Sequence, residues 1–243
     1  MRPFLHLSVR DDDLATAEEH AALLRFTGLA DDELAHRRVE RASLAGLDPA
    51  AFSGIILGGS PYDWTAPEAE KDALQRRIET ELTELVRRVI DADLPFLGLC
   101  YGVGAVAAAC DVPLTRAHPE DARLARVAVT PAGRDDPLLA DAPELLHAFV
   151  GHHEGLAATP RDAALLAVGD IAPVQMLRVG SRVYATQFHP ELDQSGFIRR
   201  AARYGGHGYY PDGHLDRVDE ATRDVDTSAA HALLRRFTEV ARR

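Results

Sequence analysis

Cysteine is scarce in this chain: its 243 residues include only Cys100 and Cys110, which lie in one apolar segment. So few cysteines exclude the disulfide framework of small secreted proteins and make a reducing cytoplasm the expected location. Lysine is scarcer, since Lys71 is the only one and arginine supplies the rest of the 27 positive charges. Because 38 acidic residues give a formal net charge of −11, the surface repels polyanions, and nucleic acid is not expected as a direct partner.

Long apolar runs are also missing. The longest uncharged stretch, residues 94–110, falls short of the ~20 residues of a membrane span and contains one proline and three glycines. The apolar start of the chain ends after a few residues at the aspartates of residues 11–13, which is too short for the core of a signal peptide. We therefore expect neither a membrane segment nor a targeting segment.

The first half of the chain alternates between strand and helix patterns. The expected strands cover residues 3–9, 52–57 and 94–99, with a short one near 38–41, and the expected helices cover 13–26, 67–90 and 101–110. Strand, helix and strand in succession predict a parallel sheet with right-handed crossovers. We expect an α/β fold in a single domain over residues 1–243.

The second half predicts further strands and then helices. Strands are expected at residues 124–129, 174–179 and 182–188, with Gly180 and Ser181 as a hairpin turn between the last two. Helices are expected at 197–204 and about 228–242, on either side of a loop at 205–214 that is rich in glycine, histidine and tyrosine.

Cys100 lies where a nucleophile is expected. The segment Gly98-Leu99-Cys100-Tyr101-Gly102 joins a predicted buried strand to a predicted helix. Small residues on both sides of the cysteine allow a sharp turn that exposes its side chain, and the helix N-terminus favours a thiolate. The alternative is a buried apolar cysteine, which is what most cysteines are. Cys110, at the far end of the helix, lacks these surroundings and is interpreted as structural.

The base for such a nucleophile is predicted at His189. His189-Pro190-Glu191 directly follows a predicted strand, and proline keeps the residue before it extended. The carboxylate two residues further on can then orient the imidazole, as in a triad of nucleophile, base and orienting acid. The same letters recur at residues 118–120, in a polar connection without a preceding strand, and we interpret that copy as chance.

A third feature supplies donors for an oxyanion. Gly58-Gly59-Ser60-Pro61 ends the strand at 52–57, and a glycine turn there can bring a backbone amide close to the nucleophile. Tyr101, the residue after the cysteine, offers a second amide at the start of its helix. Paired glycines alone are common in loops, so this turn supports a catalytic site only in combination with the Cys100 and His189 motifs.

The three motifs together, in this order and spacing, resemble the class I glutamine amidotransferases, specifically members similar to the amidotransferase part of GMP synthase. The resemblance covers about residues 50–195. It implies a flavodoxin-like three-layer fold, to which a C-terminal helical extension from about residue 193 is added. It implies a triad of Cys100, His189 and Glu191, with the amides of Gly59 and Tyr101 as the oxyanion hole. It also implies hydrolysis of glutamine through a γ-glutamyl thioester, without a cofactor.

The sequence departs from the family after the cysteine. The family commonly continues Gly-His-Gln, and that glutamine helps to hold the substrate, whereas this chain has Gly102-Val103-Gly104. The resemblance places Gly58, Ser60, Gly104 and His153 at the substrate. Space freed at Gly104 could admit a group bulkier than the amide of glutamine.

Three readings of function therefore stay open: a glutaminase, a γ-glutamyl peptidase or hydrolase with a larger leaving group, and a non-catalytic binding subunit. A Gly-x-x-x-x-Gly-Lys phosphate loop is missing from the 243 residues, so ammonia would be used by a synthetase on another chain. No metal site is expected, because the histidines at 152 and 153, His207 and His214 lack a recognised ligand spacing.

Overall fold

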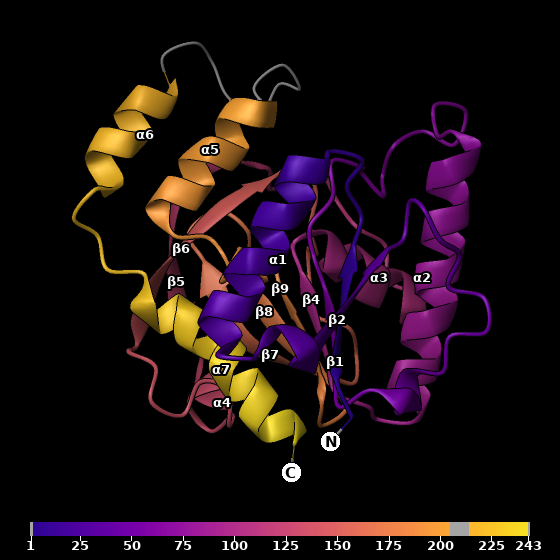
Figure 1. The fold of residues 1–243 in the computed structure, drawn as a ribbon. Helices are drawn as coiled ribbons and strands as arrows, with labels where there is room; N and C mark the ends of the chain where they lie inside the picture. The colour runs from indigo at the N-terminus through magenta and orange to yellow at the C-terminus, as the bar shows by residue number, and fades with distance from the viewer. Residues whose placement is uncertain (1, 205–213, 243) are drawn as a thin grey trace.

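The computed structural model describes residues 2–204 and 214–242, and it is built around one nine-stranded sheet (Figure 1). The strands are β1 (Phe4–Ser8), β2 (Leu34–Arg38), β3 (Ile55–Leu57), β4 (Phe96–Leu99), β5 (Glu120–Val129), β6 (Leu145–His152), β7 (Ala163–Gly169), β8 (Met176–Val179) and β9 (Val183–Thr186). The helices are α1 (Asp13–Thr27), α2 (Ala73–Asp91), α3 (Tyr101–Ala109), α4 (Pro131–Arg134), α5 (Gln194–Tyr204), α6 (His214–Thr222) and α7 (Ser228–Ala241).

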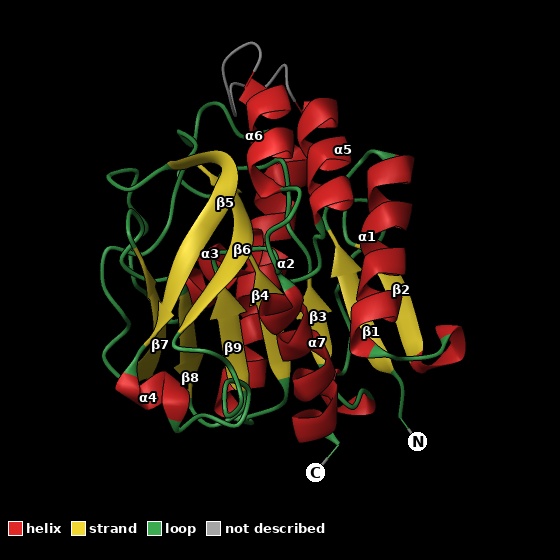
Figure 2. Ribbon diagram, turned by 90° about the vertical axis from the view of Figure 1, so that its left-hand side faces the viewer, coloured by secondary structure: helices red, strands yellow, loops and turns green. Residues whose placement is uncertain are grey.

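The sheet has a parallel half and an antiparallel half. Its order is β2-β1-β3-β4-β9-β8-β7-β5-β6. The pairs from β2 to β9 are all parallel, and the pairs from β9 onward to β6 are all antiparallel. Figure 2 shows β5 and β6 extending beyond their neighbours, beside α5 and α6. The α/β fold is as predicted, and the parallel strands bring their carboxyl ends to one edge, where ligands of such sheets bind.

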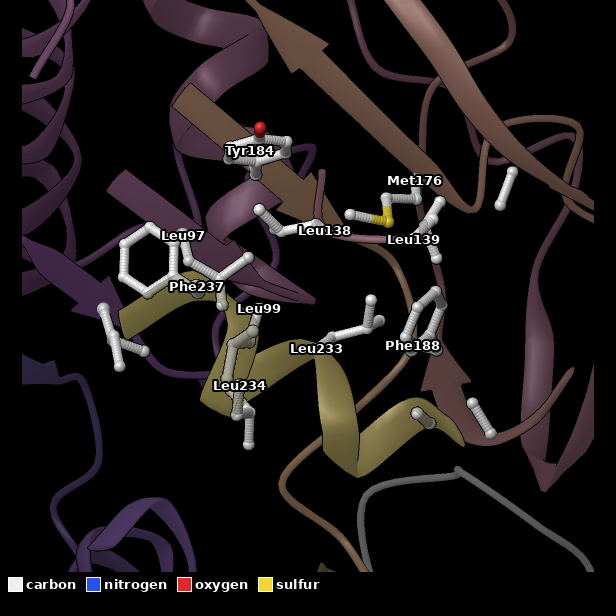
Figure 3. Close-up of a cluster of buried hydrophobic side chains, with 14 of the residues drawn as sticks. Leu97, Leu99, Leu138, Leu139, Met176, Tyr184, Phe188, Leu233, Leu234 and Phe237 are labelled. Carbon is white, nitrogen blue, oxygen red and sulfur yellow. The ribbon is translucent and has the colours of Figure 1, made fainter. Parts of the chain in front are cut away.

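Each face of the sheet carries its own core, which gives three layers. On one face, α1 and α7 cover the central strands through side chains such as Leu23, Leu234 and Phe237. Figure 3 shows this cluster, with Leu97 and Leu99 of β4 facing Leu234 and Phe237 of α7. On the other face, α2 and α3 bury a second cluster. Among the described residues, no helix is long and apolar enough to cross a membrane.

Several predicted boundaries were wrong. The short strand lies at Leu34–Arg38, before the predicted 38–41, because it is a half-exposed strand at the sheet edge with few apolar residues. The helix predicted from residue 67 begins at Ala73, after Asp72, whose side chain accepts from the Gln75 amide at 2.7 Å. Strands β6 and β7 and helix α6 were not predicted. The loop predicted at 205–214 lies, apart from His214, outside the described residues.

Candidate active site

Cys100 occupies a strained turn between β4 and α3. Its φ and ψ are 51° and −89°, values that a residue other than glycine adopts only when the surrounding structure imposes them. The amide of Cys100 donates to Thr186 O at 2.7 Å, which ties the turn to the neighbouring strand β9. A Cβ atom at Gly98 would lie 2.9 Å from the backbone of Gly102, so the tight approach of strand and helix requires a glycine there.

His189 lies beside Cys100 because β9 is the neighbour of β4 in the sheet. The His189 amide donates to Phe149 O at 2.8 Å, which fixes the backbone just beyond the strand. The imidazole is buried, and its Nδ1 lies 2.8 Å from Glu191 Oε1. Cys100 raises the pKa of this imidazole, and its Sγ donates to Gly151 O at 3.9 Å. With Nδ1 facing the carboxylate, Nε2 is the nitrogen left to face the thiol.

The pKa values of His189 and Glu191 are both shifted. Burial disfavours the imidazolium, but Glu191 and Cys100 outweigh it and raise the pKa of His189 to about 9. Burial likewise opposes ionisation of Glu191, yet His189 and Arg200 hold the pKa of this carboxyl well below its usual range. At neutral pH the site therefore contains an imidazolium held by a carboxylate.

The glycine pair after β3 leaves room for buried charged groups. A Cβ at Gly58 would lie 2.4 Å from Glu19 Oε2, and one at Gly59 would lie 2.7 Å from Arg10 Nη2 and 3.0 Å from His189 Cε1. Gly59 therefore lies against the imidazole, whereas Gly58 faces Glu19. Gly58 does not line either of the two pockets next to Cys100. Tyr101 is the first residue of α3, so its amide is one of those that a helix leaves without an internal partner.

Three charged residues next to Glu191 were not identified from the sequence. Arg200 donates to Glu191 Oε1 at 2.6 Å, and it also lies 3.6 Å from Glu19 Oε1. Arg10 donates to the same Glu19 oxygen at 3.2 Å. All three are buried. A signal was present for Glu19, since its spacing puts a carboxylate on the buried stripe of α1 that includes Ala15 and Leu23.

Two pockets lie next to Cys100, and both are lined by Ser60, Cys100 and Gly151. The first, which we call the apolar pocket, is lined by Arg10, Ser60, Pro61, Cys100, Ala122, Gly151, His189, Leu192, Phe197, Arg200, Ala201 and Tyr204. The second, the polar pocket, is lined by Ser60, Tyr62, Asp63, Cys100, Tyr101, Val103, Gly104, Leu114, Gly151, His152, His153, Glu154, Gly155 and Gln187. Only the apolar pocket includes His189, and only the polar pocket includes carboxylates.

Trp64 fills the space beside Gly104, which corrects the expectation of free volume there. A Cβ at Gly104 would lie 2.2 Å from Trp64 Cδ1. The indole donates to Tyr101 O at 3.0 Å, and the Trp64 amide donates to Glu154 Oε1 at 2.7 Å. Lys71, the single lysine, donates to Trp64 O at 2.8 Å and so holds the same loop. Gly104 lines the polar pocket, but the indole of Trp64 occupies the space next to its Cα.

The histidine loop at residues 152–155 divides into two parts. His152 is buried in β6, with Nε2 lying 3.0 Å from Glu120 Oε2, so Glu120 serves a histidine other than His118. His153 lines the polar pocket, and its Nδ1 lies 3.2 Å from Asp63 Oδ2. That hydrogen bond raises the pKa of His153. An imidazole and a carboxylate thus lie side by side on the wall of the pocket.

Comparison with known proteins identifies the family of this chain. The family model described as Glutamine amidotransferase class-I matches residues 35–199, so the chain belongs to this family. The matched segment includes the turn at Cys100 and the His189-Pro190-Glu191 motif. The resemblance inferred from the sequence is confirmed.

Individual relatives carry the name GMP synthase. The chain is 29% identical over 160 residues to glutamine-hydrolysing GMP synthase of Edwardsiella ictaluri, an alignment that covers 63% of this chain and 27% of that protein. It is 30% identical over 140 residues to one of the subunits of the glutamine-hydrolysing GMP synthase of Methanocaldococcus jannaschii, covering 57% and 64% of the two chains. The chain therefore matches only part of the length of each of these relatives.

Among solved structures, a glutamine amidotransferase from Thermotoga maritima is similar in fold. It superposes with a TM-score of 0.77 and 16% identity, over 99% of this chain and 98% of that one. A glutamine amidotransferase from Methylobacillus flagellatus gives 0.71 and 16%, over 100% and 94%.

Proposed function

We propose that the chain is a cysteine hydrolase that releases glutamate and ammonia from glutamine. The observation that carries this proposal is the His189–Glu191 pair, held at 2.8 Å and interacting with Cys100 at a strained strand-to-helix turn. A nucleophile, a base and an orienting carboxylate in this arrangement perform acyl transfer.

In the first half of the reaction, the Cys100 thiolate attacks the side-chain carbonyl carbon of glutamine. The resulting oxyanion accepts hydrogen bonds from the amides of Gly59 and Tyr101. His189 Nε2 gives its proton to the leaving nitrogen, the carbon–nitrogen bond breaks, and ammonia departs from a γ-glutamyl thioester. In the second half, His189 takes a proton from water, the hydroxide attacks the thioester, and glutamate leaves as the thiolate is restored.

The two pockets give the substrate an orientation. The leaving nitrogen must face His189, which lines the apolar pocket, so the leaving group points there. The acyl part then lies in the polar pocket, where Asp63 and Glu154 match an α-ammonium group and His153 matches an α-carboxylate. Ser60, at the junction of the pockets, lies next to the scissile bond in this arrangement.

A second candidate is hydrolysis of a γ-glutamyl amide with a leaving group larger than ammonia. Ala122, Leu192, Phe197 and Ala201 give the leaving-group side an apolar lining, which ammonia does not need. An amine that carries an apolar group would bury that surface on binding. The site chemistry is the same for both candidates, and only the leaving group differs.

We further propose that ammonia released from glutamine would serve a synthetase on a separate chain. The relative from Methanocaldococcus jannaschii is named as one subunit of a GMP synthase, which supports a division between chains. The identity of the acceptor does not affect the chemistry at Cys100.

Release of glutamate tests the proposal. We expect the purified chain to release it from glutamine, from γ-glutamyl amides of apolar amines, or from both. Cys100→Ala should reduce turnover by about 10³-fold or more, because nothing replaces the thiolate. Cys110→Ala, on the far end of α3, is the matched control and should keep nearly all activity. Equal loss in both folded variants would contradict the assignment, and inactivity on every compound would favour a binding subunit.

A further inference from the structure

Glu191 is linked through Arg200 to Glu19, and three histidines lie together next to Glu19. His6 of β1 and His36 of β2 are register partners on adjacent parallel strands, and His20 comes from α1, which covers the same face. The ring centroids are 4.6 to 5.3 Å apart, and the three rings are nearly parallel. We call this group the histidine cluster.

The nitrogens of the histidine cluster are close enough to share one ion. His6 Nδ1 lies 3.1 Å from His20 Nδ1, and one nitrogen from each of the three rings lies within 4.8 Å of the others. Nitrogens around a tetrahedral zinc ion are ~3.3 Å apart, as bond lengths near 2.0 Å require. Because the rings are stacked, His20 and His36 must rotate about χ2, a broad torsion for histidine, to direct their nitrogens at one ion. His36 is exposed and His20 is partly exposed, so both have room to turn.

The groups around the histidine cluster fit a bound cation. His6 Nε2 faces Glu19 Oε2 at 3.4 Å, and neither atom has a hydrogen bond among the described residues. A histidine that ligates a metal through one nitrogen usually directs the other at a carboxylate in this way. Ser8 Oγ lies 2.9 Å from His36 Nε2 and orients that ring. One shared ion would be bound by all three rings.

We propose that His6, His20 and His36 form a binding site for a divalent transition-metal ion, of which Zn²⁺ is the best match to three imidazoles. Glu19 is the carboxylate that supports the ligand His6. Because His36 faces solvent, the ion has an entry path and a fourth position for water. Binding to the folded chain alone would raise its melting temperature.

Metal titration tests the site. In a Cys100→Ala background, which removes the active-site thiol, ZnCl₂ and CoCl₂ are titrated by calorimetry. We expect one ion per chain, at least tenfold weaker binding in His20→Ala and in His36→Ala, and unchanged binding in the matched control His118→Ala. Melting curves of the metal-free variants establish that each is folded. X-ray absorption of the zinc-loaded chain should show imidazole nitrogens and no sulfur.

Three results would overturn the proposal. The first is the lack of stoichiometric binding by the chain that carries all three histidines. The second is binding that survives both substitutions, or that is lost equally in His118→Ala, since either places the ion elsewhere. Sulfur in the absorption spectrum would also reject the histidine cluster.

Discussion

Glu191 determines how tightly His189 holds its proton. The ordinary pKa of histidine is near 6.5, and here it is raised to about 9, so His189 can act as an acid below that pH and loses its proton above it. Removing the carboxylate charge removes the largest of the interactions that raise the pKa of His189. In Glu191→Gln we therefore expect the alkaline limb of kcat/KM to move from near pH 9 towards neutrality.

A rate profile from about pH 6 to about pH 10 measures that limb. Glu120→Gln is a suitable control, because Glu120 also pairs with a buried histidine, His152, but does not contact the triad. It should leave the limb in place. An unchanged limb in Glu191→Gln would mean that the carboxylate does not control the base.

The side chain that position 104 can hold depends on Trp64, and this dependence can be tested. A side chain at residue 104 meets the indole at 2.2 Å, so Gly104→Gln alone should be destabilised by roughly 1–3 kcal/mol through overpacking. Combining it with Trp64→Gly makes room for the glutamine that the family commonly has there. We expect the double variant to recover stability relative to Gly104→Gln and to show a lower KM for glutamine than Trp64→Gly. Additive losses in thermal melts and no gain in KM would show that the two positions are independent.

At the residue scale, the sequence predicted what short motifs encode and missed what depends on packing. The residues Cys100, His189 and Glu191 stand next to strand signals, and the structure brings them together. Arg200 and Arg10 each lie nine residues from the carboxylate to which they donate, Glu191 and Glu19, but no short motif encodes these contacts. Arg200 also approaches Glu19 from the other end of the chain, a contact that depends on the fold alone. Gly104 shows the same limit, since only the folded chain reveals that Trp64 occupies the space.

At the scale of elements, α5 builds one wall of the apolar pocket. It contributes Phe197, Arg200 and Ala201 to the lining. Ala201→Phe should fill the pocket, lowering kcat/KM for γ-glutamyl amides of bulky amines by at least about tenfold while leaving glutamine within about threefold, because only the larger leaving group needs the volume. Ala202→Phe, exposed on the same helix, should change neither activity.

Steady-state kinetics on both substrates decides the question. A parallel loss on glutamine and on the bulky amide would place the acyl group in the apolar pocket and reverse the proposed orientation. A change in neither would remove this pocket from the reaction.

The elements that the sequence predicted well are those with strong periodicity or central burial. Strands β1, β3 and β4 are fully buried, and α2 has a clear apolar stripe. Strand β2 was misplaced because an edge strand needs few apolar residues, and β7 is rich in alanine, which favours helices when read alone. Hydrogen bonding to adjacent strands stabilises both β2 and β7. A local sequence pattern does not reveal which strands will pair.

At the scale of the whole molecule, the sheet makes the site possible. Cys100 is separated from His189 and Glu191 by about ninety positions in the chain, yet β4 and β9 are adjacent parallel strands that end at the same edge. The glycine turn after β3 lies beside them for the same reason. The two cores hold this edge from both faces, so loosening either should disturb the geometry at Cys100.

We expect the chain to unfold as one unit, because both cores pack on the same sheet. Phe237 of α7 and Leu82 of α2 are buried on opposite faces. Phe237→Ala should lower the free energy of unfolding by about 3–5 kcal/mol, and Leu82→Ala by about 2–5 kcal/mol, each through lost contacts and a residual cavity. Leu14→Ala, at a side chain that is 55% exposed, should change it little.

Urea melts followed by fluorescence and circular dichroism should give coincident single transitions for all variants, shifted in midpoint but not in slope. Two separate transitions, with Phe237→Ala affecting one and Leu82→Ala the other, would instead show that the faces belong to independent folding units.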